Sequence, residues 1–166
     1  MQTKWAFSLR YVDTELVRPR WRLNGSRRVV PSVQIGFEYN PAAGELLPIA
    51  TWFVMTEQGR RPAAFFGTSS DRIGSPEGKQ AYYLTLAKNF ERVPVSVYAS
   101  LNYSEWDEGF NVPFGANIEV LPRITVQPLF DGDRMHLMAT YSAQHFNVTL
   151  IHAWLERFGI AVSAGF

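Results

Sequence analysis

Bulky apolar residues and small or polar residues alternate along most of this chain, with a repeat of two. In residues 4–11, for example, the bulky positions are Trp5, Phe7, Leu9 and Tyr11. Successive side chains of a β-strand point to opposite faces, so this repeat predicts strands with one bulky apolar face and one smaller, more polar face. Apolar residues at helical spacing are hard to find over any long window. We therefore expect an all-β chain.

Turn residues divide this pattern into about twelve expected strands. These strands cover residues 4–11, 15–23, 29–39, 46–56, 61–68, 82–90, 93–103, 114–120, 135–142, 146–150 and 158–166, with one more between the breaks at 121–123 and 131–133. Asn24-Gly25 is the strongest hairpin signal, because both central residues of a type I′ turn need positive φ. Residues 46–56 and 61–68 are apolar or small on both faces, so the pattern does not determine their register.

The lengths of the breaks also favour one architecture. In an antiparallel barrel successive connections lie at alternate ends, and outer-membrane barrels keep short turns at one end and longer loops at the other. Counted back from the last strand, the three long breaks, at residues 40–45, 69–80 and 104–111, all fall at the same end. We therefore expect an antiparallel up-and-down transmembrane β-barrel of about twelve strands, with ten as the alternative count. It forms a single domain over residues 1–166, either complete or the C-terminal part of a longer chain.

The face opposite the bulky residues is mostly small and uncharged, with sparse charges. A soluble barrel would present an outward face rich in Lys and Glu, whereas a confined, wet interior suits small uncharged side chains. The residues expected to line this lumen are Arg10, Arg18, Arg20, Arg22, Gln34, Glu38, Asn117, Glu119 and His136. Arginines facing Glu38 and Glu119 would create a transverse field that sorts small ions. The alternative is that these are ordinary paired charges that fill a narrow barrel.

Aromatic residues recur near both ends of single strands. Eight residues at about 3.3 Å rise, tilted by roughly 40°, span about 20 Å, which is near the height of the apolar band of a membrane barrel. We therefore expect six membrane-interface aromatics, namely Trp5, Tyr11, Tyr82, Phe90, Phe158 and Phe166. The alternative is that such aromatics form the core of a soluble β-sandwich or β-barrel that binds an apolar ligand.

The last strand resembles a known class of segment. Phe158, Ile160, Val162, Ala164 and the final Phe166 alternate with small residues. This pattern resembles the C-terminal signal strand of bacterial outer-membrane β-barrel proteins. The resemblance implies a location in the bacterial outer membrane, with the lipid bilayer and the outer-membrane assembly machinery as partners. A second stretch is similar to repeats in barrel proteins associated with exopolysaccharide secretion, and comprises Val112-Pro113-Phe114-Gly115-Ala116, Ile118-Glu119 and Phe130-Asp131-Gly132.

Composition excludes several classes of function. The net charge of +1, from 16 basic and 15 acidic residues, provides no bulk field for nucleic acid. The chain has no cysteine, which excludes disulfides, thiolate zinc sites and thiol nucleophiles. No apolar run approaches the roughly 20 residues of a membrane helix. The first residues lack the basic and apolar regions of a signal peptide, so an outer-membrane location requires a mature form, a longer chain or a different start.

We expect no enzymatic activity, no metal and no cofactor. His136 and Ser142 share a strand face, but about six residues separate them by roughly 20 Å, too far for a hydrogen bond. His145 falls in a turn and His152 on the apolar face. The sequence therefore favours a porin-like barrel, either a passive conduit for small solutes or ions or a structural or export-associated barrel. The alternatives are the soluble apolar-ligand binder and a barrel enzyme that acts on lipid.

Overall fold

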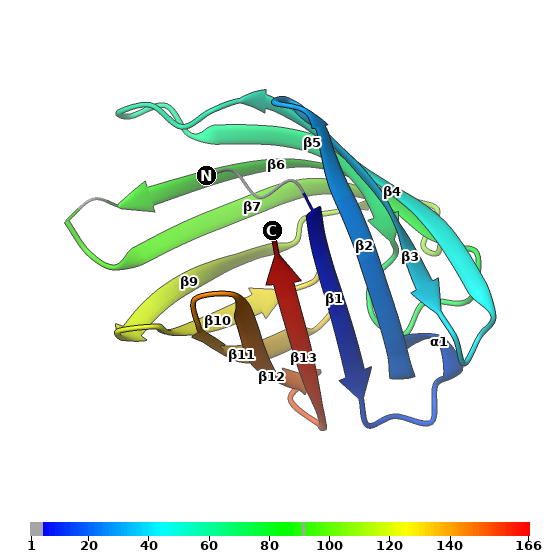
Figure 1. The fold of residues 1–166 in the computed structure, drawn as a ribbon. Helices are drawn as coiled ribbons and strands as arrows, with labels where there is room; N and C mark the ends of the chain where they lie inside the picture. The colour runs from blue at the N-terminus through cyan, green and yellow to red at the C-terminus, as the bar shows by residue number, and fades with distance from the viewer. Residues whose placement is uncertain (1–4, 91) are drawn as a thin grey trace.

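Strands that alternate bulky and small residues pair with their neighbours along the chain and form a closed antiparallel β-barrel (Figure 1). This computed structural model describes residues 5–90 and 92–166. Twelve strands close the barrel, and a short extra strand, β8 (Gly109–Asn111), pairs with β7 (Val95–Ser104). The expected all-β, antiparallel, up-and-down barrel of about twelve strands is therefore confirmed. Lys4, at the expected start of the first strand, and Glu91, in an expected turn, lie outside the described residues.

The remaining elements follow in chain order. They are β1 (Trp5–Val12), α1 (Val17–Arg20), β2 (Trp21–Val30), β3 (Val33–Asn40), β4 (Glu45–Met55), β5 (Ala63–Ser70), β6 (Gln80–Phe90), β9 (Phe114–Leu121), β10 (Ile124–Phe130), β11 (Met135–Ser142), β12 (Phe146–Ala153) and β13 (Arg157–Gly165). In the described part of the chain, no helix is long and apolar enough to cross a membrane.

The first and last strands meet and close the ring. β1 pairs antiparallel with β13, with Leu9 opposite Val162, and Figure 1 shows the two strands side by side. At the end of this pair, the N–H of Trp5 donates to the carbonyl of Phe166 at 2.8 Å. β6 also pairs antiparallel with β7, so each of the twelve barrel strands has a partner on both sides. Twelve strands that lie about 4.8 Å apart and tilt by roughly 40° make a ring about 24 Å across at the backbone.

The connections alternate between two ends of the barrel. We call the end without the three longest connections the turn end, and it includes residues 31–32, 56–62, 122–123 and 143–145. The opposite end, the loop end, carries residues 13–20, 41–44, 71–79, 105–113, 131–134 and 154–156. The three breaks expected to be long and to share one end all lie at the loop end, together with α1 (Figure 1).

The expected hairpin turn at Asn24-Gly25 is wrong. Both residues lie inside β2, with Gly25 directly opposite Phe37. A Cβ on Gly25 would come within 2.8 Å of the Phe37 ring. This glycine therefore leaves room for an aromatic ring on the neighbouring strand, and its backbone stays extended with its β-strand partners.

The expected strands at residues 15–23 and 29–39 are also wrong in their limits. Residues 17–20 form α1, and β2 starts only at Trp21. The chain then turns at Pro31-Ser32, which divides the expected 29–39 strand between β2 and β3. Proline lacks the N–H that a central strand needs, and its fixed φ suits a turn. The expected number of strands is still correct, because the turn between β2 and β3 was expected at Asn24-Gly25 and lies instead at Pro31-Ser32.

The barrel carries its bulky apolar side chains on the outside. Exposed fractions reach 61% for Leu150, 69% for Phe158 and 72% for Phe166. The most buried side chains inside are largely polar, and Glu38 and Asn40 are each 1% exposed. One small hydrophobic cluster lies inside, formed by Val12, Ile151 and Ala153 with the partly buried Met138, Trp154 and Ala161. Apolar and polar faces are therefore placed the opposite way round from a water-soluble barrel with an apolar core.

Two inward tyrosines pack over glycines on the neighbouring strand. Tyr83 lies opposite Gly67, and Tyr98 lies opposite Gly115. A Cβ on Gly67 would lie 2.5 Å from the Tyr83 hydroxyl oxygen and 2.5 Å from the backbone carbonyl oxygen of Ala50. Only a residue without a side chain therefore fits beneath the ring at this point of the wall.

Candidate functional site

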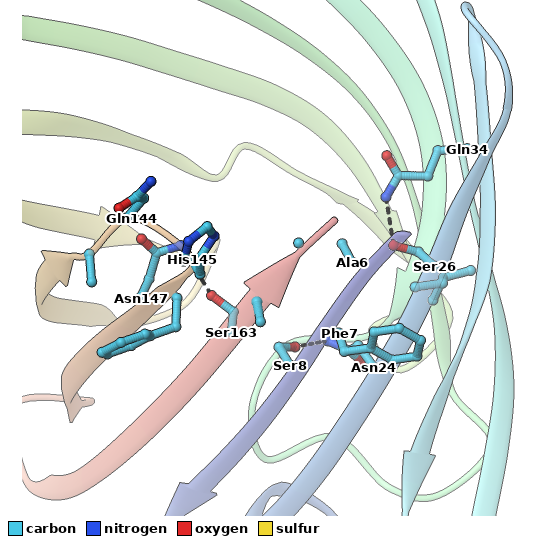
Figure 2. Close-up of a pocket in the computed structure, with 15 residues that line it drawn as sticks. Ala6, Phe7, Ser8, Asn24, Ser26, Gln34, Gln144, His145, Asn147 and Ser163 are labelled. Carbon is cyan, nitrogen blue, oxygen red and sulfur yellow. Dashed lines mark hydrogen bonds between the residues drawn. The ribbon is translucent and has the colours of Figure 1, made fainter. Parts of the chain in front are cut away.

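At the turn end the interior opens into a cavity of about 610 Å³, which we call the vestibule. Figure 2 shows its wall, which is formed by β1, β2, β3, β4, β12 and β13 together with the turn at residues 143–145. None of the described residues that line it is Asp, Glu, Lys or Arg. Its polar side chains are Ser8, Asn24, Ser26, Gln34, Gln144, His145, Asn147 and Ser163. The polar side chains of the vestibule are therefore hydroxyl, amide and imidazole groups.

Amides and serines on neighbouring strands pair in the vestibule wall. In each pair (Figure 2) an amide nitrogen donates to a serine Oγ: Asn24 to Ser8 at 3.2 Å, Gln34 to Ser26 at 2.7 Å and Asn147 to Ser163 at 3.4 Å. Elsewhere on the barrel wall, Asn117 donates to Ser96 at 3.2 Å in the same way. Because each serine oxygen accepts a bond, its O–H remains able to donate to water or to a neutral solute.

Nearer the loop end the interior becomes charged. One Nη of Arg22 lies 2.6 Å from a carboxylate oxygen of Glu38, as an ion pair that is not aligned as a hydrogen bond. Arg10 lies directly opposite Arg22, and its Nε has no hydrogen-bond partner among the described residues. The Asn40 amide donates to Glu38 at 3.3 Å and to Glu45 at 2.9 Å. Buried charges are stabilised mainly when they are paired and hydrogen-bonded. Glu38, which contacts Arg22 and Asn40, meets this condition better than Arg10 does.

Arg18 connects three parts of the loop end, and we call this set of contacts the Arg18 latch. From α1, its Nε donates to Glu45 on β4 at 2.8 Å. Its two Nη atoms donate to the carbonyls of Pro76 at 2.9 Å and Lys79 at 2.7 Å, in the 71–79 loop. The N–H of Gly78 donates to the same Glu45 carboxylate. The latch therefore holds α1 and the 71–79 loop against the barrel wall.

The latch and the charged layer leave little free space between them. The cavity between them measures about 10 Å³, and its lining includes Arg10, Arg18, Glu38, Asp71 and Arg72. This is close to the minimum volume that one water molecule needs. In the conformation described, the vestibule is therefore wide while this part of the loop end is packed.

The expected lumen residues fall in different zones. Gln34 lines the vestibule, and Arg10, Arg22 and Glu38 form the charged layer. Arg18 reaches the layer from α1, because residues 15–23 do not form a strand. Arg20 ends α1, and its Nε donates to the carbonyl of Thr14 at 2.8 Å. The four arginines therefore do not share a single strand face.

Glu119 does not lie near the arginines, so of the two acidic residues expected to face them only Glu38 does. Its N–H donates to the carbonyl of Pro94 at 2.9 Å, which places Glu119 at the turn end near Asn117. β9 runs from the loop end to the turn end, and Glu119 is near its last residues. Arg10 lies toward the loop-end limit of β1, at the opposite height of the barrel.

His136 is 3% exposed and lies at the loop end beside a turn. Its Nδ1 accepts the backbone N–H of Trp154 at 3.2 Å, and its Nε2 lies 2.7 Å from a carboxylate oxygen of Asp131. With Nδ1 as acceptor, the hydrogen of the neutral ring sits on Nε2 and is donated to Asp131. Burial raises the pKa of Asp131, but the hydrogen bonds from His136 and from backbone N–H groups outweigh it, and the net pKa is lowered. Among the described residues, no three His, Asp or Glu side chains could together hold a metal ion.

The six expected interface aromatics all lie on the outer face, at two heights. At the turn end are Trp5, Phe90 and Phe166, and at the loop end are Tyr11, Tyr82 and Phe158. His152 also faces outward and stacks on Phe158, with ring centroids 4.5 Å apart. His145 lies in the 143–145 turn, as its sequence context indicated.

Sequence reasoning missed several residues of the loop end. Glu45, Asn40 and Asp71 are buried and hydrogen-bonded there, yet each stands at a strand limit or in a loop, where polar residues are ordinary. Trp106 and Trp154 stood out less than the strand aromatics because they fall outside the alternating pattern. A bulky aromatic residue in a connection between strands was the available signal for both.

No protein-family model matches this chain, and no curated protein is significantly similar to it. The fold and the geometry of the interior therefore carry the functional argument.

Proposed function

We propose that this chain is a transmembrane β-barrel of the bacterial outer-membrane type. It serves as a non-enzymatic conduit for small polar solutes or ions and is held closed at its loop end. The observation that carries the proposal is the placement of side chains, with bulky apolar residues outside and polar residues inside. Water would be an unfavourable solvent for such an outer surface, and hydrocarbon would be a favourable one.

The dimensions of the wall support this proposal. The barrel strands are mostly eight to eleven residues long, and an eight-residue strand tilted by roughly 40° spans about 20 Å, similar to the apolar band of membrane barrels. Outward aromatics lie at both ends of this band, as in the aromatic girdles of such barrels. The last strand, with Phe158 and Phe166 facing outward, supports recognition by outer-membrane assembly machinery.

The interior supports a conduit that is closed in the conformation described. The vestibule presents hydroxyl and amide groups to any solute that enters from the turn end. Further in, the Arg18 latch and the Arg22 to Glu38 ion pair occupy the passage near the loop end. Opening therefore requires the 71–79 loop and α1 to separate from Glu45.

A soluble barrel that carries an apolar ligand is the competing function. Such a barrel needs an apolar cavity, because burial of apolar ligand surface supplies most of its affinity. The vestibule instead presents hydroxyl, amide and imidazole groups beside its few apolar side chains, such as Phe7, Ile49 and Phe146. The polar vestibule therefore favours the membrane conduit.

The test is to express this chain with and without detergent and to mix it with preformed liposomes. We expect folding, seen as a sheet-rich circular dichroism spectrum and a heat-modifiable band on a gel, only with detergent or lipid. We also expect the folded protein to float with liposomes through a density gradient and to resist extraction by carbonate. A monomer that folds and stays soluble without detergent would refute the membrane assignment.

A further inference from the structure

A second cavity, of about 320 Å³, lies at the mouth of the loop end. It is separate from the vestibule, and its walls come from five connections of the chain and the first residue of β13. Two tryptophans line it, Trp106 from the 105–113 connection and Trp154 from the turn between β12 and β13. Side chains of both charges surround them, among them Glu15, Asp133, Arg134 and Arg157. We call this cavity the tryptophan pocket.

Trp154 is held in a backbone conformation that is costly for a residue with a side chain. Its φ is 54°, and the next residue, Leu155, has a φ of 56°. The N–H of Glu156 donates to the carbonyl of Ala153 at 3.0 Å, so both left-handed residues are at the centre of a tight turn that normally uses Asn and Gly. Strain of this kind persists where the surrounding structure enforces it, and it gathers at ligand-binding sites.

The surroundings of Trp154 do enforce its position. Its backbone N–H donates to the buried Nδ1 of His136, which is itself bonded to Asp131. Its indole packs against the 71–79 loop, since a Cβ on Gly74 would lie 3.3 Å from the Trp154 ring. The guanidinium of Arg134 lies 5.8 Å from the indole centroid. Trp154 is therefore held in a fixed position at the wall of the pocket that it lines.

Trp106 is anchored in a parallel way. Its backbone N–H donates at 3.2 Å to Asp71, a carboxylate that is 5% exposed and also accepts the Ser104 hydroxyl at 2.6 Å. The guanidinium of Arg72 lies 4.4 Å from the Trp106 ring centroid and donates to Asp107 at 2.9 Å. The hydrogen bonds between the two side chains raise the pKa of Arg72 and lower that of Asp107, which keeps both charged.

We propose that the tryptophan pocket binds a neutral saccharide, most simply one pyranose unit of a glycan at the loop-end surface. A pyranose ring offers a face of C–H bonds, which packs on an indole, and a rim of hydroxyls, which can donate to carboxylates and accept from guanidinium groups. The pocket supplies both partners, with two fixed indoles and a rim that contains Glu15, Asp133 and Arg157.

The charge of the rim argues for a neutral ligand. Acidic and basic side chains stand together around the indoles, so neither a strong anion nor a strong cation meets a matching field. A purely apolar ligand would leave these charged groups without partners and desolvated. A polyhydroxylated ligand can satisfy both kinds of group while it covers the indole faces.

The test uses the full chain in an amine-oxide detergent, because detergents with sugar headgroups would compete for the pocket. Calorimetric titration and saturation-transfer NMR are carried out with methyl glycosides of glucose, galactose, mannose and N-acetylglucosamine, and with their short oligosaccharides, up to about 10 mM. The variants are Trp106→Ala and Trp154→Ala, with the milder Trp154→Phe in case the alanine variant does not fold. The controls are Trp52→Leu, on the outer face of β4, and Leu155→Gly, which keeps the left-handed turn.

We expect the wild type to bind at least one of these saccharides, and each tryptophan-to-alanine change to weaken binding about tenfold or more. Trp154→Phe is expected to weaken it less, and the two controls are expected to bind as the wild type does. Absence of binding to every saccharide, or binding that survives both alanine changes, would overturn the proposal. Preferential binding of tetramethylammonium ion would overturn it too, because that would identify a cation site. The outcome is independent of membrane insertion, since the lining residues lie in the loop-end connections, with only Arg157, the first residue of β13, in a strand.

Discussion

Leu150→Arg distinguishes a wall that faces lipid from one that faces water. Leu150 lies near the middle of β12, with Ala139 and Ile160 as its neighbours on the two adjoining strands. Its side chain points outward and is 61% exposed. If the outer face meets hydrocarbon, this position is close to the midplane of the bilayer. Arginine there costs about 2–4 kcal/mol of folding free energy, and about 0–1 kcal/mol near the interface.

The same substitution at a different height is the matched control. Leu155 is also exposed, at 51%, but it lies in the loop-end turn beyond the strands. Leu155→Arg is therefore expected to cost about 0–1 kcal/mol. In a water-soluble protein both changes would replace an exposed leucine by a charge and would stay within about 0.5 kcal/mol of the wild type.

The assay is reversible unfolding in urea with the protein inserted in lipid vesicles, followed by tryptophan fluorescence and by the heat-modifiable gel band. With a denaturant slope of about 1–3 kcal/mol per molar, the cost of Leu150→Arg lowers the urea midpoint by about 1 M or more. Leu155→Arg is expected to leave the midpoint nearly unchanged. Equal effects at the two positions, or a Leu150→Arg variant that is stable without lipid, would refute the reasoning.

Three further predictions concern the interior and the loop end. Gly67→Ala would place a Cβ 2.5 Å from a backbone carbonyl oxygen and from a tyrosine hydroxyl, so we expect it to destabilise the barrel by about 1–3 kcal/mol in the same urea assay. Gly109→Ala is the neutral control, because its Cβ would meet nothing closer than 3.7 Å. Arg18→Ala leaves the buried carboxylate of Glu45 without its cation, so we expect it to cost about 3–5 kcal/mol of folding free energy. We also expect it to increase ion conductance across a planar bilayer, and unchanged conductance would contradict a closed loop end. The lowered pKa of Asp131 contributes stability that is fully present above the pKa of about 3.9 in the unfolded chain and is lost as the pH falls through the lower pKa of the folded protein. The thermal midpoint of the wild type should therefore approach that of Asp131→Asn only below about pH 4.

The alternation of side chains determined most of the fold from sequence. Because a strand has a repeat of two, the positions of Trp5, Leu9, Leu84 and Leu150 were enough to assign an outer face, and the structure places all four outside. Counting the connections back from the last strand predicted which of them share an end, because antiparallel strands alternate in direction. The lengths of the breaks were consistent with that count. These are local properties of the chain, so no knowledge of distant contacts was needed.

Tertiary packing decided what local signals could not. Gly25 has the same sequence context as a turn glycine, and only the Phe37 ring across the strand pair shows that it serves close packing. The closure of the loop end depends on Arg18, Glu45 and the 71–79 loop meeting across long sequence separations. The tryptophan pocket likewise forms only where connections far apart in sequence come together, among them those that carry Trp106 and Trp154. Strand periodicity specifies which face a residue occupies, while the registers and loop contacts that bring distant groups together exist only in the closed barrel.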